Sequence, residues 1–124
     1  MKKLFPIVLA ILLFPLEAYS LPKWVKVAES IGGYTKVYVD VKSIKRTGKG
    51  REFTAKFIES LPDTDCKEVI SLIIVNCETD YFNVVREYCY NYSTLEPDST
   101  TFSYTNKILK GTVAEYMIKY VCNR

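Results

Sequence analysis

Residues 112–122 carry the one helical pattern in a chain that is otherwise patterned for strands. Apolar residues recur there at three- and four-residue spacing, which places side chains along one face of an α-helix: Ala114, Met117, Ile118, Val121 and Cys122. Thr112, followed three residues later by Glu115, is a capping-box signature that indicates where the helix begins. The pattern predicts one short helix with a cysteine on its buried face.

A helix of about ten residues is marginal alone, because nucleation is costly and few turns follow it. This helix must therefore be stabilised by docking on the rest of the chain. The preceding segments alternate apolar and polar residues in the way that strands do: Trp24–Glu29, Tyr34–Val41, Glu52–Ser60, Glu68–Cys77 and Tyr81–Tyr92. We therefore expect an α+β fold in which one helix packs on a β-sheet.

The segment Glu68–Cys77 has β-branched residues on both faces, which is typical of a central strand covered on both sides. The next strand returns after a short turn. If Cys77 lies opposite Tyr81, then Val69 lies opposite Cys89, and both cysteines point toward the helix.

The opposite face of that returning strand carries a tyrosine stripe, defined as Phe82, Val84, Arg86, Tyr88, Tyr90 and Tyr92. One interpretation is that the stripe completes the packing of a curved sheet, since tyrosine favours strands. The other is an interface, because one helix covers only one face of a sheet. The second interpretation predicts a homodimer or a bound protein partner, with Arg86, Tyr88, Tyr90 and Tyr92 as contact residues.

The N-terminus has the features of a secretory signal peptide over residues 1–20. Lys2 and Lys3 precede an apolar run, Leu4–Phe14, and Ala18-Tyr19-Ser20 fits a cleavage site. The run is shorter than the roughly 20 apolar residues that a membrane anchor needs. We expect the mature chain to be one domain, residues 21–124, with no membrane span.

All four cysteines lie in the expected mature chain: Cys66, Cys77, Cys89 and Cys122. An even count in a small exported domain predicts disulfides, and four cysteines allow three pairings. Zinc is disfavoured, because the chain has no histidine and no paired C-x-x-C spacing. Without Lys2, Lys3 and Glu17, the 17 basic and 14 acidic residues become 15 and 13, and a net charge of +2 does not favour nucleic acid as a partner.

The loop 43–51 is rich in basic residues, with Lys45, Arg46, Lys49 and Arg51 placed around two glycines. One interpretation is a site for an acidic partner, such as a sulfated glycan, lipid phosphate or nucleic acid. The other is a solvated turn that lysines keep soluble.

Catalysis has no support in the sequence. No histidine is available as a general base, and the chain has no Gly-rich phosphate loop and no cluster of metal ligands. Pairs of carboxylates such as Asp63 and Asp65 fall at turns, where aspartate caps its own backbone. We therefore expect a non-enzyme without a cofactor.

Several motifs resemble the bacterial surface-adhesin protein E-like family: Trp24-Val25-Lys26-Val27, Tyr38-Val39-Asp40, Ser43-Ile44-Lys45-Arg46, Asn76-Cys77 and Tyr120-Val121-Cys122. The resemblance implies an antiparallel sheet of about six strands with a C-terminal helix tethered by a disulfide. It implies that Cys77 pairs with Cys122, which leaves Cys66 and Cys89 for a second bridge.

The same resemblance implies an adhesin that binds host matrix and serum glycoproteins and forms dimers. We therefore expect an exported protein, either periplasmic or secreted or at the cell surface, that acts by binding proteins. The alternative is a periplasmic envelope or assembly factor, or an inhibitor, with no host ligand.

Overall fold

The computed structural model describes residues 21–62, 66–90, 97–100 and 103–124 of the chain. The described residues form one antiparallel sheet of eight strands and one α-helix: β1 Trp24–Glu29, β2 Thr35–Asp40, β3 Lys45–Thr47, β4 Gly50–Glu59, β5 Glu68–Asn76, β6 Tyr81–Tyr90, β7 Pro97–Thr100, β8 Tyr104–Lys107 and α2 Val113–Cys122, with a 3-10 turn η1 at Val41–Ser43. The predicted α+β class is confirmed.

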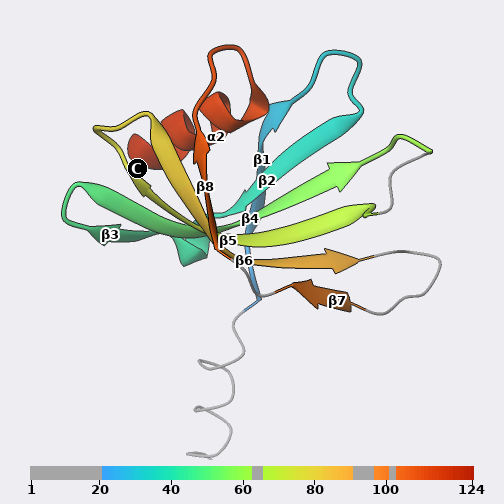
Figure 1. Cartoon of the computed structure of the whole chain (residues 1–124), viewed down its shortest axis with the longest axis horizontal. Coiled ribbons are helices and arrows are strands. Elements are labelled where there is room, and N and C mark those ends of the chain that lie inside the picture. The colour runs from blue at the N-terminus through green and yellow to red at the C-terminus, as the bar shows by residue number, and fades with distance from the viewer. Residues whose placement is uncertain (1–20, 63–65, 91–96, 101–102) are drawn as a thin grey trace, which may run out of the picture.

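The strands follow the order β1-β2-β4-β5-β6-β7, with β3 paired to the beginning of β4 and β8 paired to the beginning of β6 (Figure 1). β5 therefore lies between β4 and β6, in the central position that its apolar pattern predicts. The β1–β2 hairpin turns at Gly32 and Gly33, whose φ angles of 88° and 76° suit glycine.

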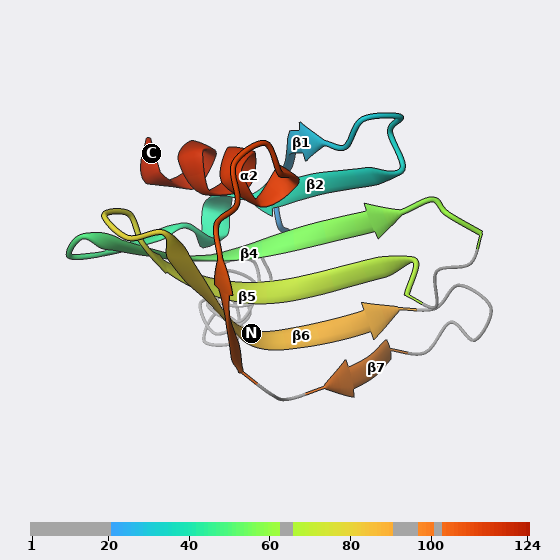
Figure 2. The same ribbon diagram turned by 45° about the horizontal axis from the view of Figure 1, so that its top comes forward.

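The helix α2 begins where its capping signature predicts. The Thr112 side chain accepts a hydrogen bond from the Glu115 backbone N–H, and the Glu115 carboxylate accepts one from the Gly111 backbone N–H. α2 lies over one face of the sheet and contacts β1, β2 and β4 (Figure 2). Met117, Ile118 and Val121 are the helix residues that it buries against the sheet.

We call the face of the sheet under α2 the helix-side face and the other the second face. Every second residue of the central strands points into the core on the helix-side face. The buried apolar residues are Val37, Val39, Phe53, Ala55, Ile73, Val75, Phe82, Val84, Met117, Ile118 and Val121. At about 25 cal/mol per Å² of buried apolar surface, this layer is what stabilises a helix too short to fold alone.

The register of β5 with β6 is confirmed in the half that contains the cysteine, where Val69 lies opposite Cys89. It then shifts by one residue, because Leu72 pairs with Arg86 but Ile73 pairs with Val84. This β-bulge leaves Val85 without a partner on β5. The residues of β6 that precede Val85 therefore point to the face opposite to the one that strict alternation predicts. Placing Phe82 and Val84 in the tyrosine stripe was therefore wrong, since both are buried in the core.

Three short strands lie where the sequence predicts loops. β3 falls in the basic loop, and β7 and β8 fall in the polar segment before the helix. Residues 95–106 are rich in Ser and Thr and contain Pro97, which predicts a long loop with a short strand at Thr101–Tyr104. That strand falls partly outside the described residues, and β8 begins at Tyr104. Main-chain pairing with β4 and β6 forms these strands without an apolar side-chain pattern.

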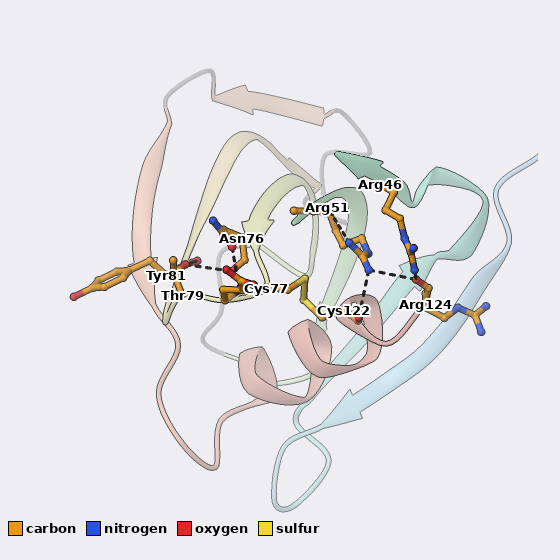
Figure 3. Close-up of a disulfide and its surroundings, with 10 residues drawn as sticks. Arg46, Arg51, Asn76, Cys77, Thr79, Tyr81, Cys122 and Arg124 are labelled. Carbon is orange, nitrogen blue, oxygen red and sulfur yellow. Dashed lines mark hydrogen bonds between the residues drawn. A yellow bond between two sulfur atoms is a disulfide. The ribbon is translucent and has the colours of Figure 1, made fainter. Parts of the chain in front are cut away.

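Two disulfides are present: one joins the pair that the family resemblance implies, and the other joins the two remaining cysteines. Cys77, directly after β5, is bonded to Cys122 at the end of α2, with their Cα atoms 5.7 Å apart (Figure 3). Cys66 is bonded to Cys89 of β6, with a Cα separation of 5.5 Å. The first bond tethers the helix to the sheet, and the second joins the chain just before β5 to β6.

Candidate functional site

The second face of the sheet presents rows of paired side chains from neighbouring strands. One row runs across four strands, because Tyr38 lies opposite Lys56, Lys56 opposite Ile70, and Ile70 opposite Tyr88. All four residues are half-buried. α2 packs on the other face, so among the described residues no helix covers this row.

The structure brings the predicted contact residues of β6 beside apolar residues of β5. Arg86 is exposed and lies opposite Leu72, and Tyr88 lies opposite Ile70. Tyr90 follows on the same face, while Tyr92 lies outside the described residues. We call this set the tyrosine surface and define it as Ile70, Leu72, Arg86, Tyr88 and Tyr90.

A cationic and aromatic cluster extends the tyrosine surface toward the edge strand β1, and sequence reasoning missed it. The Lys56 Nζ lies 4.4 Å from the ring centroid of Trp24 and 5.4 Å from that of Tyr38. It also lies 3.9 Å from the Glu68 Oε1. Cation–π contacts of this kind fix the lysine over the two rings. The alternation within β2 and β4 puts these residues on one face, but their contact depends on the pairing of β2 with β4.

Two residues of the predicted basic loop hold the end of α2. Arg51 is buried, and its guanidinium donates to the main-chain oxygens of Gly50, Cys122 and Arg124 at 2.8, 3.4 and 3.5 Å. Arg46 donates to the same Arg124 oxygen at 2.9 Å (Figure 3). Positive charge is favourable there, because the last carbonyls of a helix carry partial negative charge.

The other two basic residues of the loop are exposed. Lys45 lies on β3, and the Lys49 Nζ pairs with the Glu78 Oε2 at 3.1 Å. The four basic residues of the loop therefore do not form one free basic patch, because Arg46 and Arg51 donate hydrogen bonds to the end of α2. An acidic partner for this loop stays a prediction.

Tyr104 lies on the helix-side face, and its pKa is shifted. Burial, together with a 3.0 Å hydrogen bond from its hydroxyl to the Glu87 carboxylate, raises the pKa of Tyr104 to about 12. Within residues 21–62, 66–90, 97–100 and 103–124, no three histidine, cysteine or acidic side chains are grouped as metal ligands. The same residues include no helix long and apolar enough to cross a membrane.

The model of one protein family, described as surface-adhesin protein E, matches residues 24–123. The chain belongs to this family. The match covers every element described above, including both disulfides and the strands of the tyrosine surface. No curated protein matches the sequence.

Solved structures of protein E from Haemophilus influenzae share the fold. One is 15% identical with a TM-score of 0.59, and the similarity covers 81% of this chain and 83% of that chain. A second crystal form is 15% identical with a TM-score of 0.58, covering 79% of this chain and 87% of that chain. At this identity the likeness establishes the architecture alone.

Proposed function

We propose that the chain is an exported, non-enzymatic protein that acts by binding other proteins, as an adhesin does. In this proposal residues 1–20 are a signal peptide and residues 21–124 form the single mature domain. The family match supports a role at the cell surface. The two disulfides support export, because such bonds persist in oxidising compartments.

The tyrosine surface is the binding site that we propose. The observation that carries this proposal is that Ile70 and Leu72 of the central strand β5 keep part of their surface exposed on the second face. Central strands with two apolar faces are normally covered on both. Tyr88 and Tyr90 add large side chains with polar tips, which are enriched at protein interfaces.

A host matrix glycoprotein is the partner class that we propose, since the family is described as a surface adhesin. A second copy of the chain is the other occupant that we propose for the same surface. Arg86 beside Tyr88 and Tyr90 suits a two-fold interface, because a guanidinium packs favourably on a tyrosine ring.

Replacing Tyr88 and Tyr90 together by alanine tests the site. The matched control is Tyr34→Ala with Tyr116→Ala, because these tyrosines are 52% and 53% exposed and lie outside the tyrosine surface. Surface plasmon resonance against a panel of matrix glycoproteins measures partner binding, and sedimentation velocity measures self-association. Circular dichroism checks that both variants are folded.

We expect the Tyr88 and Tyr90 variant to bind or self-associate at least tenfold more weakly, on the order of 1.4 kcal/mol or more. The control should stay within twofold of the wild type. A wild-type protein that is monomeric and binds none of the glycoproteins would contradict the proposal. Unchanged binding by the Tyr88 and Tyr90 variant would move the site elsewhere.

A further inference from the structure

A hollow of about 350 Å³ opens beside the β3–β4 and β5–β6 turns. Gly50 creates part of it, because this residue lies between Thr47 on β3 and Asn76 on β5 in one cross-strand row. A Cβ atom at position 50 would lie 2.8 Å from the Val75 carbonyl oxygen and 3.1 Å from the Thr47 hydroxyl oxygen. Glycine is therefore required here, and it leaves the row without a side chain at its middle.

Two asparagines, Asn76 and Asn83, line the hollow. The Asn83 Oδ1 accepts a hydrogen bond from the Thr105 hydroxyl at 2.7 Å, and the Asn76 Oδ1 accepts one from the Glu78 backbone N–H at 3.0 Å. These contacts set the orientation of each amide, so the NH₂ group of each asparagine is the part left to donate hydrogen bonds to a ligand. Neither NH₂ group has a partner within the part of the chain that the structure describes.

The lining of the hollow includes one lysine and some apolar surface. The lysine is Lys49, and the pair that Lys49 makes with Glu78 is weak because both side chains are more than half exposed. No aspartate or glutamate is among the described residues that line the hollow. Tyr81 and Ile74, which are 52% and 39% exposed, add apolar surface. Asn76, Thr79 and Tyr81 lie on the side of the β5–β6 turn that faces away from the Cys77–Cys122 disulfide (Figure 3).

We propose that this hollow binds a sugar residue that carries a carboxylate, such as a hexuronic or sialic acid within a glycan. Amide donors and a lysine suit a ligand rich in acceptors, namely hydroxyls and a carboxylate. Ile74 and Tyr81 suit the C–H face of a sugar ring. The volume lies at the small end of the roughly 300–1,000 Å³ of ligand pockets, which suits a single sugar residue.

This site is separate from the tyrosine surface. None of Ile70, Leu72, Arg86, Tyr88 and Tyr90 lines the hollow. The inference therefore does not rest on the proposed function, and either can fail without the other.

The experiment is a titration of the ¹⁵N-labelled mature protein with sodium glucuronate, followed by NMR, with methyl glucoside as the neutral probe. We expect saturable shifts of the side-chain amide signals of Asn76 and Asn83, and at least tenfold weaker binding of the glucoside. Asn83→Asp should weaken glucuronate binding at least tenfold, because it keeps the acceptor for Thr105 but replaces the donor with a charged oxygen.

The matched control is Asn106→Asp, which makes the same change of charge on the neighbouring strand β8 outside the lining of the hollow. We expect its affinity for glucuronate to stay within twofold of the wild type. Three results would each overturn the proposal: no saturable shift at either asparagine, equal binding of the neutral glucoside, or unchanged glucuronate binding by Asn83→Asp.

Discussion

Removing the Cys77–Cys122 disulfide should lower the free energy of unfolding by about 4 kcal/mol. The bond closes a loop with a sequence separation of 45 residues, and the chain-entropy relation converts that length to about 4 kcal/mol at 25 °C. The Cys66–Cys89 bond spans 23 residues, for which the same relation gives about 3.4 kcal/mol. A domain of this size is stable by roughly 5–15 kcal/mol, so the variant should still fold but melt some 15–30 °C lower.

The assay is urea unfolding of the Cys77→Ser and Cys122→Ser double variant, read by the fluorescence of Trp24, the single tryptophan of the chain. Because Met117, Ile118 and Val121 remain buried, we expect α2 to stay docked, and hydrogen exchange of its amides checks this. A loss below about 1 kcal/mol would refute the entropic reasoning. Fast exchange throughout α2 in the folded variant would show that the bond holds the native helix in place.

Three further predictions concern the helix and its surroundings. Met117→Ala should lower the free energy of unfolding by about 2–5 kcal/mol, because this side chain is fully buried. Tyr116→Ala, on the exposed side of α2, should change it by less than about 0.5 kcal/mol. Urea unfolding measures both variants. Arg51→Met should cost about 1–3 kcal/mol by the same assay, because it removes the guanidinium that donates to the Cys122 oxygen at the end of α2, while Arg46 still donates to the Arg124 oxygen. The pKa of Tyr104 is about 12 in the folded protein and 10.0 in the unfolded chain, so the stability that this group contributes is present below pH 10 and is lost as the pH rises toward 12. Ultraviolet titration should show that Glu87→Gln lowers the pKa of Tyr104, because the hydrogen bond and the charge of Glu87 both raise it.

The helix and the central strands could be predicted because their signals are local. The apolar stripe of α2 and the cap at Thr112 lie within a few residues of each other, and β5 reveals its central position by being apolar on both faces. The strands β3 and β8 could not be predicted, because their side chains are mostly polar and exposed. They form by pairing with β4 and β6, and the residues of β3 and β8 themselves do not indicate that pairing.

The candidate site could be predicted only where its residues follow a local pattern within one strand. Alternation places Tyr88 and Tyr90 together, but it does not reveal the bulge at Val85, because apolar residues at both 84 and 85 fit either register. The fold selects the register that buries Val84 under the core. The contact of Lys56 with Trp24 joins β4 to β1 across β2, so no pattern within a single strand indicates it.

Protease accessibility on intact producer cells tests whether the protein reaches the outside of the cell, where an adhesin binds its partners. The culture medium is assayed beside the cells, and a known periplasmic protein serves as the control for an intact envelope. For an adhesin, we expect digestion on whole cells, or recovery of the chain from the medium, while the control stays protected. Protection until the outer membrane is opened would contradict the adhesin function and favour a periplasmic envelope factor.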